Sequence, residues 1–235
     1  MNKKRSLLMF LTISLLAAGS VVGQKDKSWK EWSKNDAQKI LKDSAWAHQQ
    51  VDQDFVEANP LRPRAIDSDV DARLKANEGM TYSIRFFSAR PVRQAFVRII
   101  QLQKKDLAPE MLTRLNTFAE TPSQDSIIVA VAVENPDANL LGKAMQIIRN
   151  ATAVKLKNTT YLERSDGKRL FIEEYTPPGS DGFGARFIFP RTLDGKPFLR
   201  PEDTMVRFVS EMDSSIKLHM TYKVKDMMVD GNLEY

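Results

Sequence analysis

The chain has 235 residues, with 35 Lys and Arg against 30 Asp and Glu, two His and no Cys. Hydrophobic residues make up 42% of the sequence and charged residues 28%, which is typical of a globular protein. This composition excludes a collagen, a fully disordered chain and a small domain held together by disulfides. Thiolate nucleophiles, zinc fingers and iron–sulfur clusters are excluded as well, because each requires a cysteine sulfur.

The first 23 residues have the three parts of a secretory signal peptide. Basic residues at 3–5 precede an apolar run at 7–16, and small residues follow at 17–20. This apolar run is too short for a transmembrane helix, which needs roughly 20 apolar residues. We expect cleavage after Gly23, with cleavage after Gly19 as the alternative. Removal of the leader leaves 32 Lys and Arg against 30 Asp and Glu, so the charge does not indicate a nucleic-acid partner.

We expect the mature protein to be exported, either to the periplasm or as a secreted protein. No later run of 18 apolar residues predicts a transmembrane segment. A cysteine-free exported chain is more typical of a bacterial envelope than of a eukaryotic secretory route, where disulfides are common. The sequence predicts no cofactor and no nucleic-acid partner, and the partner that it favours is another envelope protein.

Residues 24–79 are polar and form a segment distinct from the rest. Ser33 is expected to cap a short helix, with Asp36 three residues later near the positive end of the helix dipole. The apolar stripe of this helix consists of Ala37, Ile40 and Leu41. Between Trp46 and Gly79 the chain is strongly hydrophilic, and we predict an extended or partly disordered connection there, not a second domain.

Residues 80–235 have the pattern of a single packed domain. Alternation at 82–87 predicts a strand, and Pro91 and Pro109 each open an amphipathic helix. The residues of the second helix expected to point inward are Met111, Leu112, Leu115 and Ala119. The apolar run at 127–133 predicts a central strand covered on both faces.

The remainder of this domain is predicted to hold one more helix and then β structure. Asn135 and Pro136 are expected to provide the cap and the first residue of the helix. A hairpin is expected around Gly167, which supplies the positive φ of its turn. Further strands are predicted at 185–189, 205–211 and 216–225. Together these patterns predict an α+β fold: a mainly antiparallel sheet with about three packed helices, preceded by a short helix and a polar connection.

Neither histidine has the neighbours that metal binding or acid–base catalysis requires. His219 alternates with lysines on the polar face of its predicted strand, and His48 has no second ligand three or four residues away. We expect both to be surface residues. No Gly-x-Ser-x-Gly elbow occurs, so a serine hydrolase is not indicated. A glycosidase-like pair of carboxylates leaves no short motif and stays open. The sequence therefore assigns no catalytic, cofactor-binding or metal-binding residue.

Tryptophan is confined to the N-terminal segment, as Trp29, Trp32 and Trp46. These rings either fasten the segment onto the main domain or form an aromatic anchor for a partner protein or a sugar. We favour fastening, because large exposed apolar patches are uncommon on soluble monomers.

A group of arginines offers a second candidate for binding. Arg85, Arg90 and Arg93 surround the end of one predicted strand and the start of the next helix, where they would hold an anion together. The alternative interpretation is a solvated outer face without a ligand.

Residues 29–47 carry a resemblance. The pattern Trp29-x-x-Trp32-Ser33, followed later by Asp43-Ser44-Ala45-Trp46-Ala47, resembles the opening of an uncharacterised group of exported bacterial proteins of similar length. The group has no assigned activity, so the resemblance implies export and bacterial origin and carries over no functional residue.

Three hypotheses follow. The first is an exported, non-enzymatic envelope protein with a structural or protein-interaction role. The second is a secreted binding module for an anionic or carbohydrate ligand, and the third is a hydrolase with a carboxylate pair. A fold alone does not choose among them.

Overall fold

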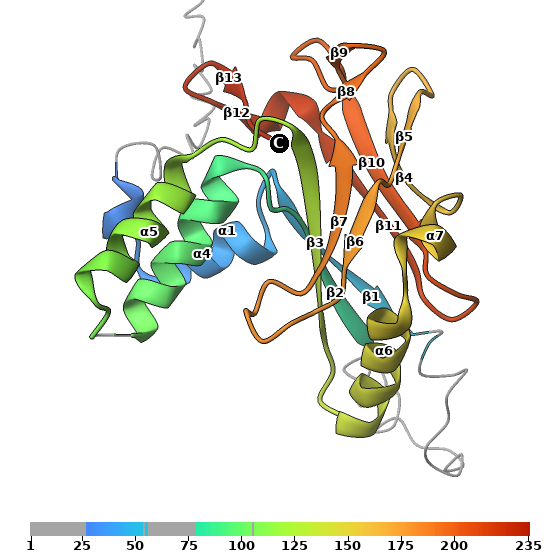
Figure 1. Ribbon diagram of the computed structural model, residues 1–235, viewed down its shortest axis with the longest axis horizontal. Coiled ribbons are helices and arrows are strands. Elements are labelled where there is room, and N and C mark those ends of the chain that lie inside the picture. Colours follow the sequence, from blue (N-terminus) through green and yellow to red (C-terminus); the bar gives the residue numbers. More distant parts are fainter. Residues whose placement is uncertain (1–26, 54, 56–78, 105) are drawn as a thin grey trace, which may run out of the picture.

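The computed structural model describes residues 27–53, 55, 79–104 and 106–235 (Figure 1). The signal peptide predicted at 1–23 lies outside the described residues, as does most of the predicted polar connection.

Two antiparallel sheets form the centre of the molecule. Sheet A has the strand order β1-β2-β3-β7-β6, and sheet B has the order β11-β10-β4-β5. Sheet A consists of β1 (Ala47–Asp52), β2 (Met80–Phe86), β3 (Ser126–Glu134), β7 (Ala185–Pro190) and β6 (Glu174–Thr176). Sheet B consists of β11 (Lys217–Lys223), β10 (Met205–Glu211), β4 (Thr160–Arg164) and β5 (Arg169–Phe171). Two small hairpins are made by β8 (Thr192–Leu193) with β9 (Lys196–Pro197) and by β12 (Met228–Val229) with β13 (Asn232–Leu233).

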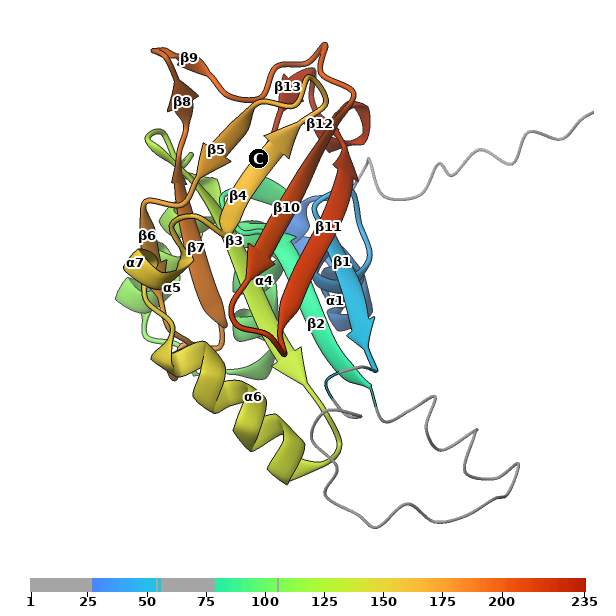
Figure 2. The same ribbon diagram turned by 90° about the vertical axis from the view of Figure 1, so that its right-hand side faces the viewer.

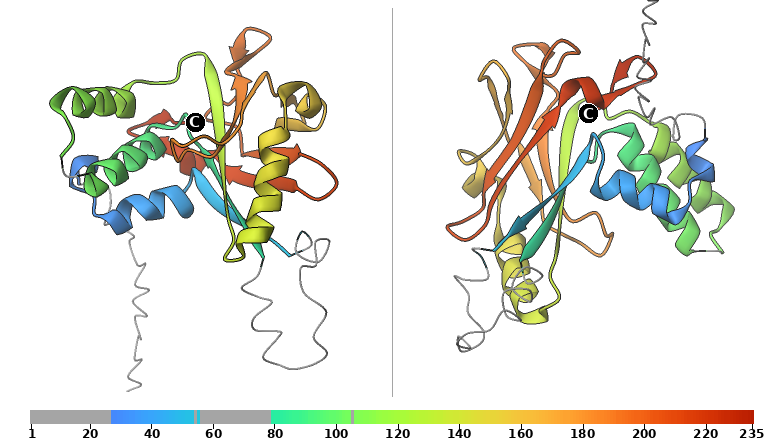
Figure 3. Two further views of the ribbon diagram at one scale, coloured as in Figure 1. Left: turned by 60° about the horizontal axis from the view of Figure 1, so that its bottom comes forward. Right: turned by 180° about the vertical axis from the view of Figure 1, so that it is seen from behind.

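The helices lie on both sides of sheet A. Their bounds are η1 (Trp29–Glu31), α1 (Lys34–Lys42), α4 (Arg90–Gln103), α5 (Pro109–Glu120), α6 (Ala138–Asn150), α7 (Ala153–Leu156) and η2 (Val224–Met227). Figures 1 and 3 show α1, α4 and α5 on one side of sheet A, with sheet B and α6 on the other. The predicted α+β class, with antiparallel sheets and several packed helices, is confirmed.

The main core lies between the two sheets, which face each other in Figure 2. Phe208 of β10 contacts the Phe187 ring of β7 with a centroid distance of 5.3 Å, and Tyr222 of β11 contacts the Phe86 ring of β2 at 4.8 Å. Alternate residues of β11 are buried, as the sequence predicts for a strand with one solvent-exposed face.

Several local signals in the sequence are confirmed. The Ser33 side chain accepts a hydrogen bond from the backbone N–H of Asp36, whose carboxylate accepts one from the Ser33 backbone, so α1 begins with a capping box. Pro91 lies in the first turn of α4. Gly167 has a φ of 79° in the β4–β5 turn.

Two predicted boundaries were wrong. Residues 47–52, placed in the polar connection, form strand β1, because pairing with β2 along its whole length supplies the backbone hydrogen bonds that weak local propensity does not. Helix α6 begins at Ala138, and its cap is Asp137, whose side chain accepts from two backbone N–H groups. Asn135 instead accepts a hydrogen bond from the Asp137 backbone, which forms the turn before the helix.

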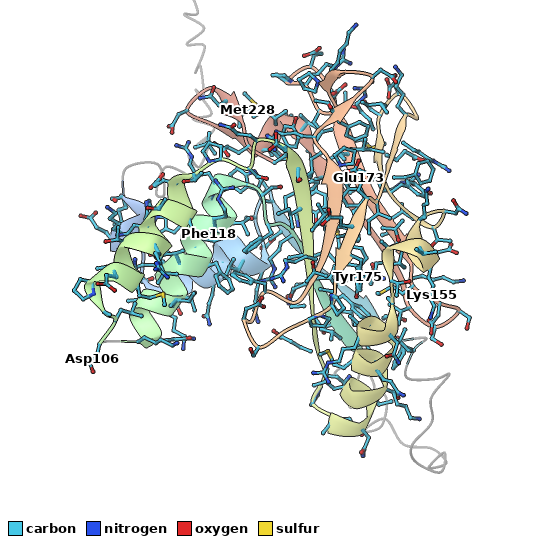
Figure 4. The ribbon with its side chains drawn as sticks, in the orientation of Figure 1. Asp106, Phe118, Lys155, Glu173, Tyr175 and Met228 are labelled. Carbon is cyan, nitrogen blue, oxygen red and sulfur yellow. The ribbon has the colours of Figure 1, made fainter. Side chains whose placement is uncertain are left out.

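The inward face predicted for α5 was also partly wrong. Ala119 is buried, but Met111 and Leu112 remain 46% and 39% exposed. The reason is that α5 packs on α4 at the outside of the molecule (Figure 1), so less of its apolar stripe finds a partner. Figure 4 shows Phe118 on α5, where its ring contacts Phe183 at 6.2 Å.

Candidate functional site

The N-terminal segment is fastened to the main domain at its start by Trp29. The Trp29 ring is buried against Val97 of α4 and Ala119 of α5. Its indole N–H donates a hydrogen bond of 2.6 Å to the Glu120 carboxylate. Trp32 packs against the same cluster and against the main core.

Trp46 fastens the same segment at its other end. Its ring is buried in the main core, and its indole N–H donates to the Glu234 carbonyl at 2.8 Å. Since Trp29 and Trp46 are both buried, and Trp32 is partly buried, the three rings do not form an exposed anchor for a sugar or a partner. The interpretation that agrees with this burial is intramolecular fastening.

Two of the three candidate anion-binding arginines already have partners within the chain. Arg90 forms ion pairs with Asp230 at 3.1 Å and Glu234 at 3.2 Å. Arg93 is buried and donates to the backbone carbonyls of Ser88 and Phe118. Arg90 and Arg93 are therefore engaged within the chain at the start of α4, and an anion site shared by all three arginines stays a prediction.

The third, Arg85, has a different environment. It is the last residue but one of β2 and lies on the face of sheet A that carries α1, α4 and α5, because its neighbour Phe86 points to sheet B. The residues directly opposite on the adjacent strands are Ala47 and Ala130. Neither alanine side chain can accept a hydrogen bond. Arg85 is only 7% exposed.

No residue that the structure describes accepts a hydrogen bond from the Arg85 guanidinium, and its Nε is fully shielded from solvent. Burial lowers the pKa of this guanidinium, and the negative charge of Glu134 opposes the effect. Arginine nevertheless stays protonated in proteins. Arg85 is thus a largely buried residue whose Nε–H has no acceptor within the described chain.

Polar residues continue from Arg85 along the same face of sheet A. The Ser83 hydroxyl accepts a hydrogen bond of 3.1 Å from the Gln49 side chain. Lys42, at the end of α1, lies 3.6 Å from the Glu134 carboxylate, and both side chains are about half exposed. We call Lys42, Gln49, Ser83, Arg85 and Glu134 the Arg85 strip. The Lys42–Glu134 pair contributes little to stability, because both side chains are about half exposed and water competes with the interaction.

Two shallow hollows open on the described surface. One, which we call the edge hollow, lies beside β1 and is lined by Lys42, Asp43, His48, Gln49, Met220 and Thr221. The other lies beside α7 and is lined by Ala153, Val154, Lys157, Ile172 and Glu173. Each lining contains a single carboxylate, so neither hollow supplies the facing pair that a glycosidase-like mechanism needs. The edge hollow shares Lys42 and Gln49 with the Arg85 strip.

Neither histidine belongs to a group of described side chains that could hold a metal ion. His219 is exposed, as expected, and His48 is half-buried where it lines the edge hollow. The His48 ring stacks on Tyr222 with a centroid distance of 5.0 Å and is partly buried. Burial lowers its pKa, and Asp43 partly opposes this shift. Within the described residues, no three His, Asp or Glu side chains are grouped so that they could hold a metal ion.

No family model, no curated protein and no solved structure matches this chain. Among the described helices, none is both long and apolar enough to cross a membrane. The feature that the sequence could not identify is the isolation of Arg85. Its sequence neighbours suggested a shared arginine cluster, and only the strand register shows that alanines flank it.

Proposed function

We propose that the protein is exported to the bacterial envelope and there binds an anionic ligand at the Arg85 strip without converting it chemically. The observation that carries this proposal is that Arg85 is only 7% exposed and that its Nε–H, shielded from solvent, has no acceptor in the described chain. A carboxylate or phosphate group would accept two of its N–H donors at once.

A buried arginine that lacks an acceptor lowers the stability of the folded protein. An unpaired charge in a protein interior costs several kcal/mol, so buried charges are normally paired. A residue that lowers stability in the free protein is characteristic of a binding site, where the ligand restores the missing interaction. Ser83, Gln49 and Lys42 add polar groups on the same face for the remainder of the ligand.

The decisive experiment compares Arg85→Met with Arg186→Met. Arg186 lies on the same face, on the far side of Ala130, but is paired with Asp181 at 2.6 Å. We expect Arg85→Met to stabilise the ligand-free protein by about 1–3 kcal/mol, because it removes an unpaired buried charge. Arg186→Met should destabilise it by less than about 1 kcal/mol.

Thermal unfolding in sodium sulfate, phosphate or acetate then measures binding. The wild type and Arg186→Met should gain stability with anion concentration as a binding isotherm predicts, whereas Arg85→Met should show only the weak general salt effect. A ligand-free Arg85→Met protein that is less stable than the wild type, with the same anion dependence, would contradict the proposal.

Export has its own test. Cell fractionation should recover the protein outside the cytoplasm with a new amino terminus at residue 24 or 20, as mass spectrometry would show. Replacement of the basic residues at 3–5 by Gln should leave more of the full-length chain in the cytoplasm. Recovery of the wild-type chain from the cytoplasm with its leader intact would contradict export.

A further inference from the structure

The side chain of Gln50 binds the free edge of strand β11. Its amide N–H donates to the Lys217 carbonyl at 2.7 Å, and its carbonyl oxygen accepts from the His219 backbone N–H at 2.9 Å. A side-chain amide has the same donor and acceptor as a peptide group, so Gln50 takes the place that a neighbouring strand would occupy. We propose that the next part of this edge binds an acidic peptide in an extended conformation, as an additional strand of sheet B.

The strand register identifies which backbone groups are free. The Val224 N–H donates to the Thr204 carbonyl, so the backbone N–H and C=O groups of the even-numbered residues of β11 point toward β10. The backbone N–H and C=O groups of the odd-numbered residues therefore point outward from this edge of sheet B. Gln50 satisfies two of their groups, and the next pair along the edge is the His219 carbonyl and the Thr221 N–H. No described residue binds this second pair.

The edge hollow leaves room for a peptide at this second pair. Thr221 and Met220 form one wall, and the other consists of His48 and Gln49 of β1 with the end of α1. His48 is held in place by stacking on Tyr222. Figure 2 shows β1 and β11 side by side at the same edge of the two sheets. A peptide can therefore use the backbone of β11 and contact the His48 wall at the same time.

The charges along β11 select the occupant. Lys217 and Lys223 are exposed, Lys225 lies two residues beyond Lys223 in η2, and the strand contains no carboxylate. A second copy of β11 on this edge would bring lysines against lysines, which opposes pairing. Glutamates or aspartates at alternate positions of an incoming strand would instead face these lysines. The edge hollow shares Lys42 and Gln49 with the Arg85 strip, but the backbone groups that would pair with the peptide belong to β11 of sheet B, whereas Arg85 lies on β2 of sheet A.

The test uses a fluorescently labelled peptide in which Glu alternates with Val and Thr, and a control peptide with Lys in place of Glu. Thr221→Pro removes the N–H that the peptide needs, and Thr221→Val keeps it. Proline is tolerated on an edge strand where the N–H faces outward, so the fold should survive. Anisotropy should show roughly tenfold weaker binding for Thr221→Pro than for the wild type and Thr221→Val, since one hydrogen bond is lost.

Three further measurements separate this proposal from anion binding at the Arg85 strip. Gln50→Ala frees the first pair of edge groups and should strengthen binding several-fold, because the peptide then has a longer edge to pair with. Hydrogen exchange on the wild type should show the Thr221 amide becoming protected when the acidic peptide is added, which needs no variant at all. Arg85→Met should leave peptide binding unchanged, whatever happens to the anion site.

The proposal is overturned if the Thr221 amide stays unprotected at saturating peptide, or if the acidic and basic peptides bind equally well. Equal binding to folded Thr221→Pro and Thr221→Val overturns it too. Weaker binding to Arg85→Met, with Thr221→Pro unaffected, would place the peptide on the Arg85 strip and so also contradict this inference.

Discussion

The indole N–H of Trp46 donates a hydrogen bond to the backbone carbonyl of Glu234, a residue 188 positions away. The Glu234 carboxylate in turn pairs with Arg90 at the start of α4. One residue near the carboxyl end thus connects the N-terminal segment to the first long helix. This arrangement explains why the segment that contains α1 and β1 packs with the rest of the core.

Trp46→Phe tests this connection. The substitution keeps an aromatic ring but removes the hydrogen bond and leaves the Glu234 carbonyl without its donor, so we expect a loss of about 1–3 kcal/mol in the free energy of unfolding. Urea unfolding measures the loss. Phe171→Leu, at an exposed ring, is the control and should change stability by less than about 0.5 kcal/mol. Equal stability of Trp46→Phe and the wild type would show that the contact contributes nothing.

Tyr82 and Tyr222 provide a matched pair of buried hydroxyls. Tyr222 donates to the Ile84 carbonyl at 2.8 Å, whereas the Tyr82 hydroxyl has no partner among the described residues. Tyr222→Phe should therefore cost about 1 kcal/mol, and Tyr82→Phe should be neutral or stabilising, because it removes a buried polar group that bonds to nothing. Chemical denaturation of both variants measures the two changes in the free energy of unfolding. A larger loss of stability for Tyr82→Phe than for Tyr222→Phe would contradict this prediction.

Gly184, at the entry to β7, has no room for a side chain. Its φ is 85°, and a Cβ there would lie 2.3 Å from the Val131 carbonyl oxygen. Gly167 has a similar φ of 79° but open space around it. Gly167→Ala should cost about 1 kcal/mol from backbone strain alone, and Gly184→Ala should cost at least about 3 kcal/mol, because β3 and β7 would be forced apart. Similar melting temperatures for Gly167→Ala and Gly184→Ala would contradict this prediction.

His48 should make stability depend on pH. Its pKa in the folded protein is lowered below its ordinary value of 6.5 by burial, so the unfolded chain takes up its proton first as the pH falls. Stability is therefore complete above the unfolded pKa, decreases as the pH falls through that value, and levels off below the folded pKa. His48→Gln should show a flatter profile between about pH 7.5 and 5. If the two profiles differ only by a constant offset, His48 is not responsible.

The sequence predicted those parts of the fold that depend on local chemistry. The Ser33–Asp36 cap, the Pro91 helix start and the Gly167 turn are each determined by a few neighbouring residues, and all three are confirmed. Strand β1 was missed because its sequence holds only one β-branched residue and two glutamines; its conformation comes from its partner β2. The face of α5 was misjudged because periodicity shows that a stripe exists, without showing how much of it is covered.

The candidate site depended on contacts that no local pattern contains. Arg85, Arg90 and Arg93 are close in the sequence, but their environments differ. Arg90 pairs with residues near the carboxyl end, and Arg93 donates to the Ser88 carbonyl just before α4. The Arg85 Nε–H has no acceptor in the described chain. The one available signal was alternation in β2, which placed Arg85 opposite the face of Ile84 and Phe86. Alternation did not show that its strand neighbours on that face were alanines.

The hydrogen bonds between Gln50 and β11 have a consequence for the order of folding. Strand β1 emerges early in synthesis, yet its Gln50 and the preceding Trp46 bind residues that emerge last. A chain exported to the envelope behind an amino-terminal leader, as we propose, would have to keep this segment unpaired until those residues follow. Completion of the native state then coincides with the arrival of the final strands, and any delay there leaves the open edge of β1 exposed to chaperones or to neighbouring chains.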